Sequence, residues 1–164
     1  MTHITRRRPR IPADYDIATG EEGMLEWPDV AASLAAAPIF WVATVTPGPA
    51  PHLIPIWGAW ADDAAFIEGG NTRWRRNLTE GDGATHVGVD HGGLQVMVRG
   101  TAAYTEVDSA VRQAIIECYG AKYPYRPEGT EFWRIEPRSV LAWKIDPVEA
   151  FSTSPTEFRF EASS

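Results

Sequence analysis

Two glycines and three arginines lie close together in residues 69–78, and this segment carries the clearest chemical signal in the sequence. Thr72 suits the position just before a helix, and Arg73, Arg75 and Arg76 follow it directly. The start of a helix attracts anions through its free N–H groups and its dipole, and guanidinium groups add paired donors that fit phosphate oxygens. A charged, solvent-facing helix surface also explains this spacing. Because Arg73 and Arg76 repel each other on a bare helix, the pattern leans toward a phosphate site for a bound cofactor.

A second polar group, His86, Asp90 and His91, is spaced as ligands of a metal or of a haem iron would be. His86 and Asp90 fall on one side of an expected strand, but His91 falls in the following turn, and no second cluster completes a coordination sphere. Cys118 is the only cysteine, so neither a thiolate cluster nor a disulfide within the chain is expected. We therefore interpret the group as part of a surface strand and expect no metal site.

Other reactive or aromatic residues receive structural roles. Glu68 precedes the arginines and is expected to form an ion pair with one of them. Tyr123, Tyr125 and Trp133 are expected to pack across a subunit interface, although they also suit the floor of a substrate pocket. The sequence has no Ser-His-Asp order, Walker loop or dinucleotide glycine fingerprint, and it singles out no catalytic acid or base.

Composition limits the class of protein. The 164 residues include 15 Lys+Arg against 22 Asp+Glu, which gives a formal net charge of −7 and argues against a general nucleic-acid binder. A hydrophobic content of 44% is typical of a folded domain. No run reaches the roughly 18 apolar residues of a membrane span, and the basic stretch 5–10 is not followed by the apolar core of an export signal. We expect a cytoplasmic protein that contacts neither membrane nor nucleic acid.

The hydrophobic pattern predicts a mainly β (α+β) fold with a few short helices. Residues 1–24 are expected to be extended or poorly ordered, and residues 25–164 are expected to form a single domain. Helices are predicted after Pro28 up to Pro38, over 72–81, and from Asp108 to Gly120. Short alternating segments separated by turn residues predict a six-stranded antiparallel barrel, with a further edge strand at 157–160. The six strands are expected at 40–46, 52–60, 64–68, 85–90, 94–106 and 139–146.

One strand carries large apolar residues on both faces. Ile54, Ile56 and Trp57 cannot all point to one side of a strand, so both faces of the barrel wall are expected to be covered. A homodimer that buries the outer face explains this pattern.

Four motifs, in the right order and with the right gaps, resemble the pyridoxamine 5′-phosphate oxidase-like FMN-binding split barrels, and more specifically their flavin/deazaflavin oxidoreductase branch. Residues 52–57 correspond to the R-x-V-L-L-K strand of that superfamily, and residues 72–78 to its S-R-K-A-x-x-L segment. Residues 95–100 correspond to Q-V-x-V-x-G, and residues 137–143 to P-x-x-x-x-x-W. The resemblance extends from about residue 34 to residue 160.

The resemblance implies a homodimer that binds FMN or a deazaflavin (coenzyme F-420) at the subunit interface. It implies that the strand at 52–57 lines the ring, that the start of the following helix holds the phosphate, and that Gln95 reaches the ring from the neighbouring subunit. Trp143 would pack near the ring, and Arg159, in a tail that looks like the T-R-W-R-F ending of the branch, would be a further contact. The full set of expected cofactor-binding residues is His52, Leu53, Ile54, Pro55, Ile56, Trp57, Thr72, Arg73, Arg75, Arg76, Asn77, Gln95, Trp143 and Arg159.

The chain also departs from the oxidase pattern. His52 stands where the oxidases have arginine, and Trp57 and Trp74 stand where they have lysine. Either Arg75 and Arg76 compensate, or the chain binds flavin weakly, or it prefers the longer-tailed deazaflavin. The R-x-H-D segment that grips pyridoxal phosphate is absent, which argues against oxidation of vitamin B6.

These observations predict an FMN- or deazaflavin-dependent oxidoreductase that transfers a hydride to or from a small organic substrate. Two alternatives stand beside it. The first is a split barrel that binds or degrades haem, an activity of the same superfamily. The second is a flavin- or deazaflavin-binding module without turnover.

Overall fold

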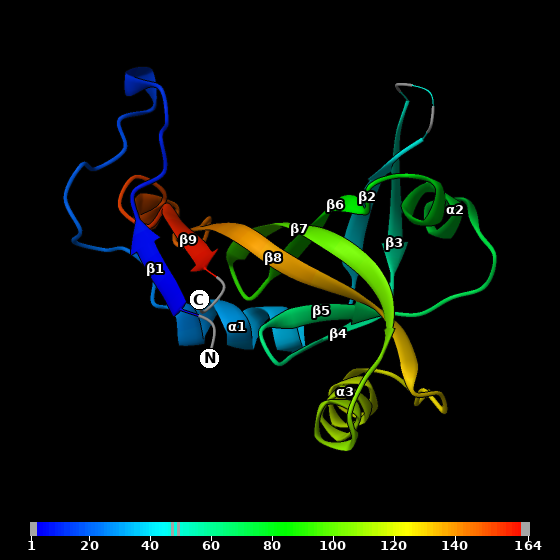
Figure 1. Cartoon of the computed structure of the whole chain (residues 1–164). Coiled ribbons are helices and arrows are strands. Elements are labelled where there is room, and N and C mark those ends of the chain that lie inside the picture. Colours follow the sequence, from blue (N-terminus) through cyan, green and yellow to red (C-terminus); the bar gives the residue numbers. More distant parts are fainter. Residues whose placement is uncertain (1–2, 47, 49, 162–164) are drawn as a thin grey trace.

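The computed structural model describes residues 3–46, 48 and 50–161, and nine strands in those residues form one antiparallel sheet (Figure 1). The order along the sheet is β1-β9-β8-β7-β6-β2-β3, and a β4–β5 hairpin joins it through β8. The strands are β1 (His3–Arg7), β2 (Phe40–Val45), β3 (Pro51–Ile56), β4 (Gly58–Ala61), β5 (Ala64–Ile67), β6 (Ala84–His91), β7 (Leu94–Glu106), β8 (Glu131–Lys144) and β9 (Thr156–Glu161).

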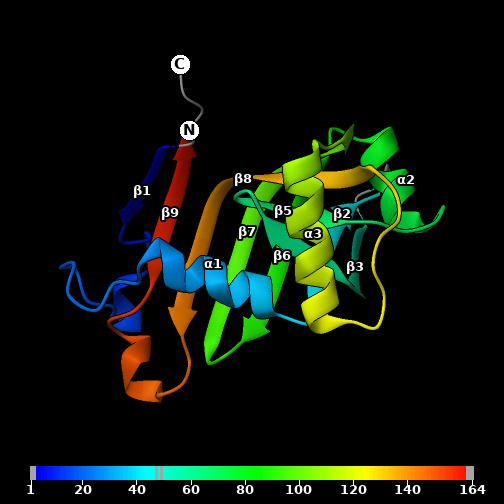
Figure 2. The same ribbon diagram turned by 90° about the horizontal axis from the view of Figure 1, so that it is seen from below.

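The described part of the chain has three α-helices, and two of them, α1 and α3, lie near each other in front of the strands when the molecule is seen from below (Figure 2). Helix α1 (Trp27–Ala36) begins with a proline in its first turn and buries Val30 and Leu34. Helix α3 (Ser109–Lys122) is capped by Asp108, whose carboxylate accepts the N–H groups of Ala110 and Val111 at 2.9 Å. Helix α2 (Arg73–Glu80) lies apart from these two, beside β2 and β3 (Figure 1). Short 3-10 helices occupy Ala13–Tyr15 and Val148–Phe151.

The long strands β7 and β8 hold the sheet together. They pair with each other along their whole length, and the other edge of β8 pairs first with β5 and then with β9. A bulge interrupts the β7–β8 pairing next to Gly100, where a Cβ atom would lie 2.3 Å from the carbonyl oxygen of Glu136. Only glycine permits this close approach of the two backbones.

Two apolar cores lie on either side of the β4–β5 hairpin. The larger core lies between α1 and the sheet, and it includes Trp60 and Ile67. The smaller core lies under α3, where Phe66 and Phe132 meet edge to face with ring centroids 6.3 Å apart. All residues of β4 and β5 are buried, and a helix of the same chain covers their second face. The covered second face, from which we expected a homodimer, therefore needs no partner subunit at this hairpin.

The mainly β, antiparallel fold predicted from the sequence is confirmed, and the edge strand expected at 157–160 is present as β9, while the count of six barrel strands and one edge strand is corrected to nine strands in the described residues. The strand expected at 52–60 is divided at Trp57, because Gly58 crosses the Phe40 ring at a point where a Cβ atom would lie 2.6 Å away. Strand β8 begins at Glu131, eight residues before the predicted start. The segment before residue 25 contains strand β1, which pairs with β9 over five residues.

Candidate functional site

Strand β3 forms an open edge of the sheet. Among the described residues it pairs only with β2, and Pro51 and Pro55 have no N–H to give to a neighbouring strand. Because alternate residues of a strand direct their backbone groups to the same side, the prolines place Leu53 on the open edge as well. Leu53 therefore has the one N–H that points outward from this edge. The carbonyl groups of Pro51, Leu53 and Pro55 point outward beside it.

Helix α2 packs on β2 through a buried polar contact. The side-chain N–H of Asn77 donates to the hydroxyl of Thr44 at 2.9 Å. His52 lies directly opposite Thr44 in the β2–β3 register, so its ring is on the face that α2 covers. Its Nδ1 atom is buried and has no hydrogen-bond partner in the described structure. A buried polar atom of this kind is incomplete until a ligand or water supplies a partner.

The three arginines of α2 do not act as one group. Arg73 and Arg76 are exposed, and no carboxylate of the described residues pairs with either. Arg75 turns toward the preceding loop, where its Nη1 atom donates to the carbonyl of Gly69 at 3.4 Å and its guanidinium lies 5.2 Å from the centre of the Tyr104 ring. Thr72 precedes the helix, and its side chain makes no capping hydrogen bond. The free positive charge therefore belongs to Arg73 and Arg76.

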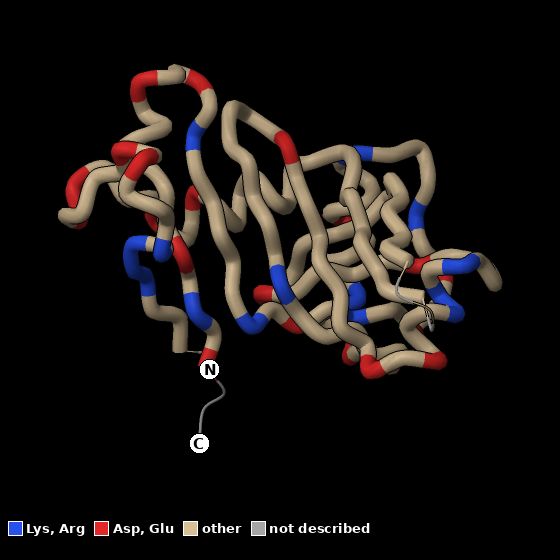
Figure 3. The backbone as a smooth tube through the Cα atoms, turned by 90° about the horizontal axis from the view of Figure 1, so that it is seen from above, with Lys and Arg blue, Asp and Glu red and all other residues tan. Residues whose placement is uncertain are grey.

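The outer face of the sheet, which the helices leave open, carries exposed apolar side chains beside polar ones. Trp41 is 46% exposed and Leu53 is 60% exposed. Gln95 and Trp143 lie opposite each other on β7 and β8 and line a shallow hollow that also includes Trp41 and Leu53. In Figure 3 the middle of this face is largely free of Lys, Arg, Asp and Glu. Trp41 is not among the residues expected at the site, because β2 is apolar at nearly every position and only its burial pattern in the structure sets Trp41 apart.

His86 also lies on this outer face, opposite Arg99 of β7. Burial, and secondly the positive charge of Arg99, lower the pKa of His86. The described residues contain no group of three His, Cys, Asp or Glu side chains arranged to hold a metal ion.

Several expected site residues lie elsewhere. Ile54 and Ile56 pack against the larger core. Trp57 stacks on Tyr123 with ring centroids 4.6 Å apart, within an aromatic cluster at the end of α3. Arg159 lies on β9, where it pairs with Glu157 at 2.7 Å.

Two expectations about neighbouring residues are wrong. Glu68 accepts a hydrogen bond from the Tyr125 hydroxyl instead of pairing with an arginine, and this bond raises the pKa of Tyr125. Tyr123 and Trp133 are buried inside the chain, so the interface role expected for them is wrong, whereas Tyr125 is 42% exposed and its interface role stays a prediction.

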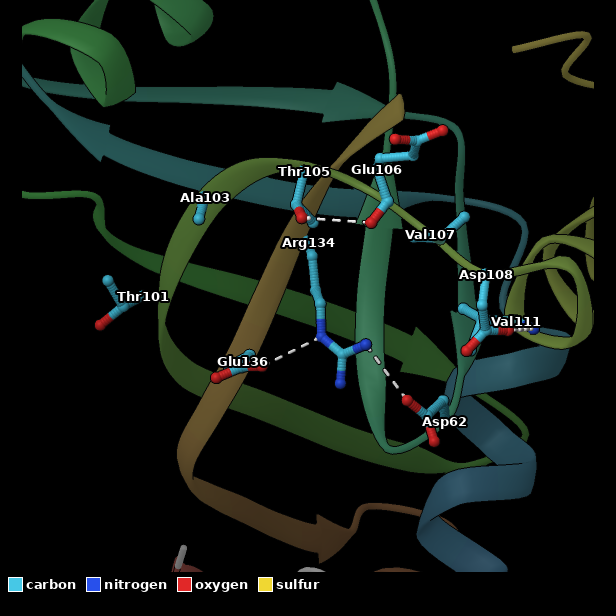
Figure 4. Close-up of a pocket in the computed structure, with 10 residues that line it drawn as sticks. All are labelled: Asp62, Thr101, Ala103, Thr105, Glu106, Val107, Asp108, Val111, Arg134 and Glu136. Atoms are coloured by element: carbon cyan, nitrogen blue, oxygen red, sulfur yellow. Dashed lines mark hydrogen bonds and ion pairs between the residues drawn. The ribbon is translucent and has the colours of Figure 1, made fainter. Parts of the chain in front are cut away.

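A separate hollow lies between β7, β8 and the β4–β5 turn (Figure 4). Its one arginine, Arg134, is paired with Asp62 and Glu136 at 3.1 Å each, and it lies 5.5 Å from the centre of the Phe66 ring. With its positive charge already matched, this hollow offers nothing to the phosphate group expected from the sequence.

Comparison with known proteins identifies the family. Residues 27–146 match the family model described as "Pyridoxamine 5'-phosphate oxidase", and the chain belongs to this family. No curated protein matches the chain. The resemblance derived from the four motifs is thus confirmed at the level of the family.

Solved structures confirm the split-barrel fold. The conserved hypothetical protein Rv2991 from Mycobacterium tuberculosis superposes with a TM-score of 0.60 and 21% identity, over 82% of this chain and 90% of that chain. HupZ from Group A Streptococcus superposes with a TM-score of 0.55 and 15% identity, over 73% of this chain and 95% of that chain. A heme binding protein from Mycobacterium smegmatis superposes with a TM-score of 0.56 and 18% identity, over 68% of this chain and 51% of that chain. In the described residues, no helix has the length and apolar character required to cross a membrane.

Proposed function

We propose that the chain is an oxidoreductase that holds FMN or a deazaflavin (coenzyme F-420) and transfers a hydride between this cofactor and a small organic substrate. The observation that carries the proposal is the group at the start of α2. In the described residues, Arg73 and Arg76 are exposed and pair with no carboxylate, and their helix packs on the strand face that carries the buried, unpartnered Nδ1 atom of His52. A phosphate or similar anion would neutralise the charge of the two arginines and give the His52 nitrogen a hydrogen-bond partner.

The open edge of β3 suits the ring of such a cofactor. Leu53 presents one N–H and its neighbours present carbonyl groups, which match the acceptors and the donor along the polar edge of a flavin. Thr72, Arg73, Arg76 and His52 would hold the phosphate. The bound cofactor supplies the hydride chemistry, while the chain binds it, orients it and excludes water. We assign no acid or base to the chain.

The second half of this site comes from a partner subunit. Gln95 and Trp143 lie on the outer face of β7 and β8, where they share a hollow with Leu53, whereas the residues proposed to hold the phosphate belong to α2 and to the face of β3 that α2 covers. A second copy seated on the outer face brings its Gln95 and Trp143 to the β3 edge of the first. A homodimer with the cofactor between its subunits would place Gln95 and Trp143 of one subunit opposite the phosphate-binding residues of the other.

The test is reconstitution with each cofactor. FMN and the deazaflavin are titrated separately into flavin-free protein, and binding is followed by fluorescence. Arg73→Ala is expected to weaken binding of the preferred cofactor about tenfold or more, since a charge-assisted contact contributes about 1.5–3 kcal/mol. The matched control is Arg126→Ala, which removes an exposed arginine beside α3. An unchanged dissociation constant in Arg73→Ala overturns the phosphate assignment. Cofactor reduced chemically and then offered organic acceptors separates an enzyme from a binding module.

One observation favours haem as a second candidate. His86 lies on the apolar outer face near Trp41 and Met97, and its lowered pKa keeps the imidazole neutral, as an axial ligand requires. A protein of the same fold is described as a heme binding protein. Titration with haem decides the matter: a sharp Soret band that is lost in His86→Ala, without uptake of flavin, favours haem over the flavin proposal.

A further inference from the structure

An arginine-rich hollow lies on the outer face at the β1 end of the sheet, away from α2. Four arginines and a single glutamate line it, although the chain as a whole is acidic. The arginines are Arg7, Arg10, Arg99 and Arg159. Figure 3 shows several Lys and Arg on this side of the molecule, interspersed with Asp and Glu of the surrounding loops. The excess of positive charge in one hollow needs an explanation, because like charges on adjacent strands destabilise a sheet.

Strand register places three of the lining residues in one row. Arg99 on β7 is opposite Ser139 on β8, and Ser139 is opposite Arg159 on β9. Neighbouring strands lie about 4.8 Å apart, so the two arginines stand about 10 Å apart with a small residue between them. Two long side chains at this spacing can converge on one group above Ser139. The bulge next to Gly100 directly adjoins this row, and bulges commonly redirect side chains beside binding sites.

The ion pairs in the hollow do not neutralise its positive charge. Glu157 accepts from Arg7 and from Arg159, in both cases at 2.7 Å, and its side chain is only 13% exposed. In the described structure Arg99 and Arg10 pair with no carboxylate. Glu157 thus positions two guanidiniums without neutralising the hollow, and Arg99 remains the free donor on the other side of Ser139.

An apolar surface continues from this row along the same strands. Leu141 lines the arginine-rich hollow and is opposite Met97, and Trp143 follows two residues later on the same face. Consecutive residues on one face of a strand are about 6.6–6.8 Å apart. A ligand with an anionic end at Arg99 and Arg159 therefore has room for an apolar body over Leu141, Met97 and Trp143.

We propose that Arg99, Ser139 and Arg159 form an oxyanion cradle, which binds the carboxylate or phosphate end of a small molecule whose apolar part lies on Leu141. This assigns Arg159 to a site separate from the phosphate residues of α2. The anion-binding residues of the cradle are separate from the proposed flavin site, because neither Arg73, Arg76 nor the β3 edge takes part in it; Trp143 at the far end of the apolar surface is the one residue that both proposals share.

The cradle is tested on the flavin-free full chain by calorimetry at fixed ionic strength, with 2-naphthoate, acetate and inorganic phosphate as probes. The expected result is one saturable site for 2-naphthoate, with about tenfold weaker binding in Arg99→Gln and in Arg159→Gln. Leu141→Ser is expected to weaken the binding of 2-naphthoate and to leave the affinity for phosphate unchanged. Arg126→Gln is the charge-matched control and should bind like the unaltered chain. Equal affinity in Arg99→Gln, or no saturable binding of 2-naphthoate and phosphate, overturns the proposal.

Backbone amide shifts in a nitrogen-15 spectrum locate each probe. Binding in the cradle shifts the amides of Arg99, Ser139 and Arg159, and it raises the pKa of the adjacent His86 because the anion offsets the charge of Arg99. Shifts confined to Arg73 and Arg76 place the probe at α2 and count against the cradle. Because the flavin titration follows different residues, either proposal can fail while the other holds.

Discussion

His52 carries a buried nitrogen that forms no hydrogen bond with any of the described residues. An unmet buried polar group costs about 1–3 kcal/mol, and an apolar replacement of similar shape removes that cost. We therefore expect His52→Leu to leave the free energy of unfolding unchanged or to raise it, while weakening binding of FMN or the deazaflavin. Chemical denaturation and fluorescence titration on the same sample provide both quantities. A clear loss of stability in His52→Leu, with cofactor affinity unchanged, would assign the imidazole a structural role.

His86 provides a pH-dependent signal on the outer face. Its pKa is lowered chiefly by burial and then by Arg99, so the unfolded chain takes up a proton near the ordinary histidine pKa while the folded chain stays neutral. The contribution of His86 to stability is therefore present above the ordinary pKa and is lost as the pH falls toward the lowered one. Arg99→Gln should raise the pKa of His86 without restoring the ordinary value, because burial remains. Imidazole proton shifts followed against pH measure this directly, and no movement in Arg99→Gln would contradict it.

At the scale of elements, one side chain fixes the N-terminal segment. The Arg8 guanidinium donates to four backbone carbonyls, those of Gly20, Glu22, Thr153 and Pro155, at 2.6–2.9 Å. These contacts join the loop after β1 to the loop before β9, and β1 completes the connection by pairing with β9. Burial lowers the pKa of Arg8, which nevertheless remains a cation at neutral pH.

We expect Arg8→Gln to lower the free energy of unfolding by about 1.5–3 kcal/mol, because the carbonyls lose a charged donor. The loss should appear first as faster hydrogen exchange of the β1 amides, while the amides of β6 keep their protection. Arg126→Gln serves as the control for removal of a charge. If β1 exchanges at the same rate in Arg8→Gln as in the unaltered chain, another contact holds the segment.

These contacts also explain which elements the sequence predicts and which it does not. Strands β2, β5, β6 and β7 have alternating or β-branched patterns with clear turns, and the sequence places all four. Strand β1 consists largely of arginine and polar residues, so its pattern reads as a solvated terminus. It forms a strand only because it pairs with the edge of β9 and because Arg8 donates hydrogen bonds to the carbonyl groups of distant loops. Such long-range partners leave no local signal.

The same limit applies to the candidate site. The sequence locates the arginines of α2 correctly, but it does not distinguish Arg75, whose direction is set by Gly69 and Tyr104. The unpartnered nitrogen of His52 follows from the packing of α2 on β2, which spacing alone does not reveal. Arg99 and Arg159 are 60 positions apart in the sequence, and only the strand order β9-β8-β7 brings them into one row.

The whole molecule has two unlike faces. Helices α1 and α3 pack on the two apolar cores (Figure 2), while the outer side of β2 and β3 is left open, with Trp41, Leu53 and Val45 each more than 40% exposed. A contiguous apolar surface of this kind marks an interaction site on a soluble protein. The arginine-rich hollow and the β3 edge lie at its two ends, so a second copy on this face meets both charged and apolar groups.

We expect the chain to be a dimer in solution, and Trp41→Glu to make it a monomer, because the new carboxylate would be buried against apolar groups of the partner. Sedimentation equilibrium over a range of concentrations measures the association, and circular dichroism confirms that the variant is folded. Tyr15→Glu is the matched control, since Tyr15 is 57% exposed in the 3-10 helix at Ala13–Tyr15. If the partner supplies Gln95 and Trp143, the monomeric variant should also bind the flavin cofactor more weakly, although Arg73 and Arg76 are intact. A Trp41→Glu variant that remains a dimer moves the interface elsewhere, and a monomeric variant with full cofactor affinity places the complete site within one chain.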